Sequence, residues 1–172
     1  YFRRIAKRAT EIIGPSTKVV EFLRRCGVER HVNIIPNTVD LSDFMVENVD
    51  PKEIAATKEK LGIRPGDVSL FFVGRLGKEK SLDTLIDLFT ENFAGESQYK
   101  LFIVGDGPEA AALRQQVAQR KMKDQIHLLG RVDHDLLPPY FQACDLFATA
   151  SLSEINSISM LEAMASGLYV VQ

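Results

Sequence analysis

From residue 68 onward, short apolar runs alternate with segments of helical period, and this alternation limits the chain to few folds. The run Val68 to Val73 is almost continuously apolar, which is typical of a strand covered on both faces. Repeated strands and helices of this size predict an α/β fold, a Rossmann-like doubly wound parallel sheet with helices on both faces. The expected strands are 68–73, 100–104, 126–129, 145–149 and 168–171, and the expected helices are 81–93, 108–121, 134–143 and 158–166.

The segment before residue 68 has a different pattern. We expect helices over 1–13, over 17–26 with Ser16 as its N-cap, and over 51–61. Gly27 and Gly62 are the expected stops of the second and third helices. A short strand is expected at Val32 to Ile35, followed by a turn and an irregular linker. The chain ends directly after a core strand, so we expect it to be a piece of a longer protein.

Charge is distributed unevenly along the 172 residues, although the net charge is only −2. Residues 1–31 carry eight Lys or Arg against three Glu, a net of +5, which leaves −7 for the remainder. A basic segment beside an acidic body fits contact with anionic lipid, and it equally fits a solvated helix face. Two cysteines without metal-ligand spacing fit a reduced compartment, so we expect a cytoplasmic protein.

Polar residues cluster where the expected strands end, which is where ligands bind in folds of this class. Gly74, directly after the first long strand, allows close approach of a ligand to the backbone. Arg75 and Lys80 follow it as two cations, one suited to forked contacts with phosphate oxygens and one acting as a point charge. Ordinary surface charge on a loop is the alternative interpretation.

Two carboxylates, Glu154 and Glu162, stand eight residues apart across an expected strand-to-helix junction. The residues that open the helix, Asn156, Ser157 and Ile158, would offer backbone N–H groups and the positive end of the helix dipole to an anion. The carboxylates can accept hydrogen bonds from hydroxyl groups. This combination suits a molecule that is part diphosphate and part sugar.

Glu162 lies among apolar residues of its helix, between Leu161 and Ala163. A helix of this composition should be largely buried, and a buried carboxylate needs partners such as ligand hydroxyls or a cation. The competing interpretation makes both glutamates surface residues of the helix. Combined with Arg75 and Lys80, the pattern favours a binding site.

Gly105 to Ala110 matches the loose dinucleotide fingerprint G-x-G-x-x-A, and so a nicotinamide-binding dehydrogenase domain is an alternative. Pro108 argues against it because proline lacks the N–H that a pyrophosphate would use. The next strand also ends in Gly130-Arg131 rather than in a ribose-binding acid. We interpret the segment as a tight turn near the ligand. A non-catalytic nucleotide-sugar-binding module remains a further alternative.

The other residues capable of chemistry receive no role. The histidines His31, His127 and His134 have no metal-ligand spacing. We expect His127 to be a core or rim residue of its strand and His134 to cap a short helix. Cys144 is expected to be a small core residue.

Taken in order, four segments resemble motifs of the glycosyl transferases group 1, the glycogen-synthase-like family of retaining enzymes with a GT-B fold. The resemblance runs from about residue 10 to the end and is to the carboxyl-terminal, nucleotide-sugar-binding half. The segments are Ile34–Asp40 (family I-P-N-G-V-D), Phe72–Leu76 with Glu79-Lys80 (V-G-R-L…E-K), Val104–Pro108 (G-D-G-P) and Glu154–Gly167 (the paired glutamates).

The resemblance implies a role for each candidate residue. Arg75 and Lys80 would bind the donor diphosphate, beside Gly74, and Glu162 the nucleotide ribose. Glu154 would act as the catalytic residue that holds hydroxyls of the transferred sugar. The backbone at Asn156, Ser157 and Ile158 would hold phosphate. No metal or other cofactor is implied, because the cations and the helix dipole stabilise the charge.

The resemblance also implies how the protein is organised. Residues 1–33 would be the end of the amino-terminal GT-B domain with linker helices, and 34–172 the nucleotide-sugar-binding domain, truncated at its carboxyl end. The donor would be a nucleotide sugar, with UDP as the first choice of nucleotide. A lipid or glycan acceptor would bind to the missing amino-terminal domain, so the isolated chain should be inactive. Nucleic acid is not an expected partner.

Two departures from the family pattern bear on specificity. The family usually has Phe-Gly or Gln-Gly after the first glutamate, where this chain has Ile155-Asn156-Ser157, and proline at the position of Tyr169. The variant Ser153 to Ser157 most resembles bacterial enzymes that glucosylate diacylglycerol lipids. This resemblance implies that the protein uses UDP-glucose to make glycolipids. It also implies a peripheral protein at the inner face of the membrane. The donor sugar, base and acceptor stay open.

Overall fold

The computed structural model describes residues 2–36, 38–151 and 157–172, which fall into two compact units. The first unit extends to Val39 and contains the helices α1 (Phe2–Ala6) and α2 (Thr17–Arg25). Its strands β1 (Ile13–Gly14) and β2 (Asn33–Ile34) form a parallel pair. A small core holds the unit together, made of Ala6, Leu23, Val28 and Val32.

The expected helix over 1–13 is wrong beyond Ala6. Ile13 and Gly14 form the strand β1 instead, and the Asn33 N–H donates to the carbonyl of the preceding Ile12 over 2.8 Å. β-Branched residues directly before Gly14-Pro15 favour an extended backbone over a helix. Ser16 occupies the N-cap position of α2, but its side chain makes no capping hydrogen bond.

The second unit begins at Asp40 and is built on a five-stranded parallel sheet in the order β5-β4-β3-β6-β7. The strands are β3 (Val68–Val73), β4 (Tyr99–Val104), β5 (Ile126–Gly130), β6 (Leu146–Ala148) and β7 (Tyr169–Val171). The helices are α3 (Pro51–Leu61), α4 (Leu82–Phe93), α5 (Ala110–Gln119), α6 (Pro138–Ala143) and α7 (Ile158–Ala165), with 3₁₀ turns η1 (Ser42–Phe44), η2 (Val46–Asn48), η3 (Lys78–Lys80) and η4 (His134–Leu136). The predicted α/β class and doubly wound sheet are confirmed.

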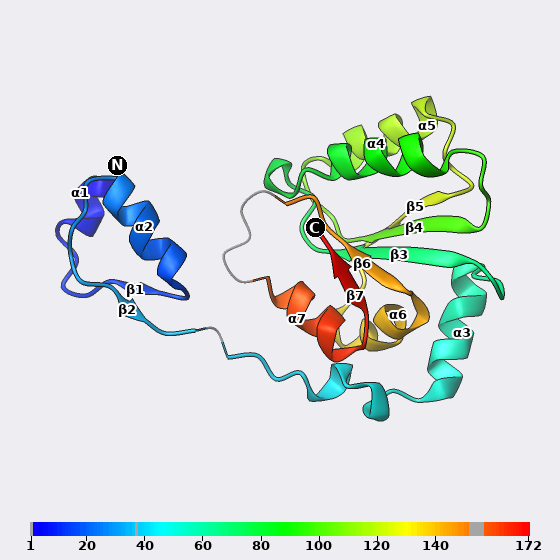
Figure 1. Ribbon diagram of the computed structural model, residues 1–172, viewed down its shortest axis with the longest axis horizontal. Coiled ribbons are helices and arrows are strands. Elements are labelled where there is room, and N and C mark those ends of the chain that lie inside the picture. The colour runs from blue at the N-terminus through cyan, green and yellow to red at the C-terminus, as the bar shows by residue number, and fades with distance from the viewer. Residues whose placement is uncertain (1, 37, 152–156) are drawn as a thin grey trace. The chain divides into compact units, whose positions relative to one another are not determined.

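Helices cover both faces of the sheet, α4 and α5 on one and α3, α6 and α7 on the other (Figure 1). Alternate residues of one strand serve the two faces: Phe72 packs in the α4–α5 layer and Phe71 in the opposite layer. Phe71 also meets the ring of Phe141 on α6 edge-on, with centroids 5.0 Å apart. The strands are therefore buried on both sides, as their apolar runs predicted.

Two predicted helices in this unit differ at their boundaries. The helix expected from Pro108 begins at Ala110, because the Glu109 N–H is bound by the Leu76 carbonyl in a turn. The helix expected over 134–143 is split into η4 and α6. Pro138 and Pro139 lack backbone N–H groups, so the hydrogen-bond ladder cannot run through them and a new helix starts there.

The strand order places a topological switch point between β3 and β6. The chain moves outward from β3 to β4 and β5, then returns to add β6 and β7 on the other side. Segments that leave the carboxyl ends of β3 and β6 therefore run to opposite faces and leave a crevice between them. This edge of the sheet is where a ligand is expected.

Candidate functional site at the carboxyl edge of the sheet

The loop after β3 carries two of the predicted cations. The Arg75 side chain is 70% exposed, and its Nη1 lies 3.9 Å from Oε1 of Glu79. Lys80 ends η3 and is half-buried. The next residue, Ser81, has a φ of 48°, a left-handed conformation that is uncommon for serine and turns the chain sharply into α4. The loop thus presents Arg75 and Lys80 on a tightly turned backbone.

The turn after β4 packs backbone against backbone on this loop. Leu76 N–H donates to the Asp106 carbonyl, and Glu109 N–H donates to the Leu76 carbonyl, each over 3.0 Å. A Cβ atom on Gly105 would lie 1.9 Å from the Gly74 carbonyl oxygen. A Cβ atom on Gly107 would lie 2.5 Å from the Leu76 carbonyl oxygen. The close contact accounts for both glycines without any bound dinucleotide, in agreement with a structural turn.

The segment after β6 is joined to the loop after β3 through Ser151. Ser151 is 3% exposed, and its hydroxyl donates to the Glu79 carbonyl over 3.1 Å. This bond ties together the two segments that border the switch point. No local sequence pattern indicates a role for Ser151, because its partner lies 72 residues away.

Glu162 lies inside α7 and is only 3% exposed, so the prediction of a buried carboxylate is confirmed. Its Oε1 is 2.8 Å from Nε2 of His134, on η4. An ionised carboxylate accepts only, so the imidazole Nε2–H is the donor in this pair. The His134 ring also contacts the Phe44 ring, with centroids 5.2 Å apart.

His134 is therefore a second site residue, in addition to Ser151, that no sequence pattern indicated. It was expected to cap a helix, whereas Asp133 occupies the N-cap position of η4. No motif or spacing could have indicated the contact with Glu162, since the two residues are 28 positions apart and meet only in the folded chain.

The remaining predicted site residues can be placed as follows. Gly74 follows β3 directly, and its N–H donates to the Val104 carbonyl over 3.1 Å. Ile158 is the first residue of α7, and Ser157 immediately precedes it in the chain. Glu154 and Asn156 lie outside the described residues, so their predicted roles stay predictions.

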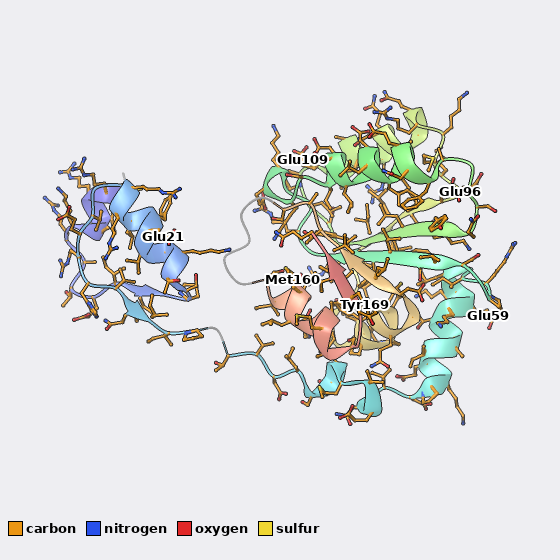
Figure 2. All side chains as sticks on the ribbon, viewed as in Figure 1. Glu21, Glu59, Glu96, Glu109, Met160 and Tyr169 are labelled. Carbon is orange, nitrogen blue, oxygen red and sulfur yellow. The ribbon has the colours of Figure 1, made fainter. Side chains whose placement is uncertain are left out.

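The arrangement of these groups in the fold can be followed in Figure 2. Glu109, just before α5, and Met160, in the first turn of α7, lie on the side of the sheet where the strands end, whereas Glu96, before β4, lies at the opposite edge. The strand ends therefore gather cations from the β3 loop and the buried carboxylate from α7 at one edge. The cations can bind an anion, and the carboxylate can accept a hydrogen bond from a neutral hydroxyl group.

Two other titratable residues belong to the core. Burial raises the pKa of the Cys144 thiol to about 12, which makes it a poor nucleophile. Burial, followed by the charge of Lys100, lowers the pKa of His127, whose ring stacks on Phe102. Both residues match their predicted structural roles.

Within the described ranges, no group of three or more His, Cys, Asp and Glu side chains is arranged to hold a metal ion. In the same part of the chain, none of the helices combines the length and the apolar character needed to cross a bilayer.

Solved structures with the same fold define the class of the domain. The chain superimposes on the Anabaena protein Alr3699/HepE in complex with UDP and glucose with a TM-score of 0.83 and 23% identity, covering 98% of this chain and 47% of that one. It superimposes on sucrose-phosphate synthase from Thermosynechococcus elongatus with a TM-score of 0.80 and 23% identity, covering 98% and 41%. The fold is that of one half of a GT-B glycosyltransferase.

The sequence comparisons give the family. Residues 53–172 match the glycosyl transferases group 1, and the chain belongs to this family as a carboxyl-terminal domain. It is 30% identical over 159 residues to the alpha-monoglucosyldiacylglycerol synthase of Acholeplasma laidlawii, covering 92% of this chain and 40% of that protein. The enzyme of the same name from Streptococcus pneumoniae is 28% identical over 160 residues, covering 93% and 36%. The chain thus spans about two-fifths of these relatives.

Proposed function

We propose that this chain is the donor-binding domain of a retaining glycosyltransferase that takes a sugar from a UDP-sugar. The observation that carries the proposal is the placement of Arg75, Lys80 and Glu162 at one edge of the sheet, beside the switch point. The Anabaena protein of the same fold was solved with UDP and glucose, which supports a UDP-sugar donor.

Each group has a definite task in this proposal. Arg75 and Lys80 bind the diphosphate and stabilise the charge that grows on it as the bond to the sugar breaks. The buried carboxylate of Glu162 accepts a hydrogen bond from the nucleotide ribose. Glu154 holds hydroxyls of the sugar, and the backbone at Asn156, Ser157 and Ile158 receives phosphate. The cations and the helix dipole perform the stabilisation, with no metal or other cofactor required.

Calorimetric titration of this chain with UDP, GDP and NADH tests the donor class. We expect UDP to bind more tightly than NADH, because the terminal diphosphate of UDP brings more negative charge to the two cations than the bridging pyrophosphate of NADH does. We expect it to bind more tightly than GDP because a protein of the same fold was solved with UDP. A nicotinamide-binding domain, the competing class, would bind NADH most tightly, and that result would overturn the proposal. A nucleotide-sugar-binding module without activity is excluded once the full-length protein transfers sugar from the donor.

We further propose that the full-length protein acts on a lipid acceptor at the cytoplasmic face of a membrane, in glycolipid synthesis. The names of the two relatives, both alpha-monoglucosyldiacylglycerol synthases, support the lipid acceptor. The first unit supplies a physical basis: the last turn of α2 carries the exposed Arg24 and Arg25 near the exposed Phe22. Basic residues near anionic lipid contribute about 1 kcal/mol each.

Co-sedimentation of the full-length protein with vesicles tests the membrane step. Binding at low salt is expected to require anionic lipid, and the double variant R24A/R25A should lower it roughly thirtyfold, from about 1 kcal/mol for each charge. The matched control K52A/K58A removes the same charge from α3 and should bind as the parent does. If sedimentation of the protein does not depend on anionic lipid and the protein transfers sugar to a soluble glycan, the proposal is contradicted.

A further inference from the structure

We propose that His134 is a positioning residue of the donor site, which holds the carboxylate of Glu162 in the orientation that receives the nucleotide ribose. The inference rests on the role proposed above for Glu162 and adds the residue on which that role depends. Its starting point is the 2.8 Å contact between His134 Nε2 and Glu162 Oε1.

A donor is required at this position. The Glu162 side chain is 4% exposed, and a buried carboxylate is strongly unfavourable unless hydrogen bonds or an opposite charge compensate it. His134 supplies such a bond at a normal length. The contact engages Oε1, so the other carboxylate oxygen can accept a hydroxyl group of a ligand. The histidine thereby fixes the direction in which the second oxygen points.

The imidazole also contacts an aromatic ring. The ring of Phe44, which is 1% exposed, contacts it with centroids 5.2 Å apart. Phe44 is anchored in turn by an edge-on contact with Phe141, at 5.4 Å, and by the Ser166 hydroxyl, which donates to the Phe44 carbonyl over 3.0 Å. Ser166 directly follows α7, the helix that carries Glu162. Phe44, which contacts His134, is thus hydrogen-bonded to the residue that follows the helix carrying Glu162.

Exposure distinguishes this role from core packing. The His134 side chain is 63% exposed, so truncating it removes little buried surface and should leave the fold intact. Its loss instead leaves Glu162 Oε1 without this donor, and the carboxylate can then rotate to seek water. We therefore expect truncation of His134 to weaken ribose recognition rather than the stability of the fold.

Calorimetric titration of the chain with UDP and with 2′-deoxy- and 3′-deoxy-UDP reads out ribose recognition directly. The parent is expected to prefer UDP over at least one deoxy analogue by tenfold or more, as for hydrogen bonds to charged groups. In H134A this preference should fall to about twofold or less, while the deoxy analogue binds nearly as it does to the parent. H134Q, which keeps a side-chain N–H donor, should recover most of the preference. The control D135A, at the exposed residue next to His134 in the same turn, should match the parent.

The outcomes separate the two proposals. If the parent itself does not distinguish UDP from either deoxy analogue, the ribose role of Glu162 fails and the inference fails with it. If the parent distinguishes them and H134A does so equally well, only the positioning role of His134 is overturned. Equal weakening of all three nucleotides in H134A, with a lowered melting temperature, would mean that His134 is merely structural and would also overturn the inference.

Discussion

Replacing Arg75 or Lys80 by alanine is expected to weaken the binding of UDP roughly 10- to 150-fold, from about 1.5–3 kcal/mol for a hydrogen bond to a charged group. Arg75 is 70% exposed and pairs with Glu79 only at 3.9 Å, so the guanidinium can turn to a diphosphate at little cost. The stability of R75A should change little, since an exposed ion pair of this kind contributes at most about 1 kcal/mol. Isothermal titration gives the affinities, and thermal melting checks the fold.

The same turn supplies the control. Lys78 opens η3, carries the same charge as Lys80 and is exposed. If the site recognises phosphate through defined contacts, K78A should bind UDP nearly as the parent does, whereas K80A should not. Equal weakening in both variants would indicate a diffuse electrostatic effect, which 0.5 M salt would largely remove because screening shortens the range of exposed charges. Parent-like binding by both R75A and K80A would refute the assignment.

The strands and most helices of the second unit could be predicted because their signals are local. The apolar run Val68 to Val73 coincides with β3, and the helix predicted over 51–61 coincides with α3, which ends at Gly62 with a φ of 65°. A strand that is buried on both faces needs apolar side chains at successive positions, so the apolar run itself indicates the strand. The predictions failed where a local pattern competes with a distant partner, as at Ile13–Gly14, which pairs with a strand 20 residues further on.

In the candidate site, too, the features with local signals could be predicted and the contacts between distant segments could not. Glu162 could be predicted to be buried because its helix neighbours are apolar, and Arg75 and Lys80 could be placed at the strand ends because their loop follows a clear strand. The partners of these groups could not be predicted. His134 reaches Glu162 and Ser151 reaches Glu79 only because the sheet order brings segments far apart in sequence to one edge.

Gly105→Ala is expected to destabilise the second unit by about 3 kcal/mol or more, the upper range for an overpacked and strained position. The added Cβ would lie 1.9 Å from the Gly74 carbonyl oxygen, at a residue whose φ is 136°. Neither backbone can easily withdraw. Gly105 N–H is bound to the Gly130 carbonyl over 2.8 Å, and Gly74 N–H is bound to the Val104 carbonyl over 3.1 Å.

Gly95→Ala is the matched control, because Gly95 also has a positive φ, of 87°, but a Cβ there would meet nothing within 4 Å. It should cost only about 1–2 kcal/mol, the price of the left-handed backbone alone. Urea unfolding gives both values, with the midpoint falling and the slope unchanged if only stability is affected. Because the clash pushes on Gly74, the residue before Arg75, G105A should also lose affinity for UDP under conditions in which it is still folded. If G105A unfolds at the same urea concentration as G95A, the close packing of the two turns is not what holds this edge of the sheet together.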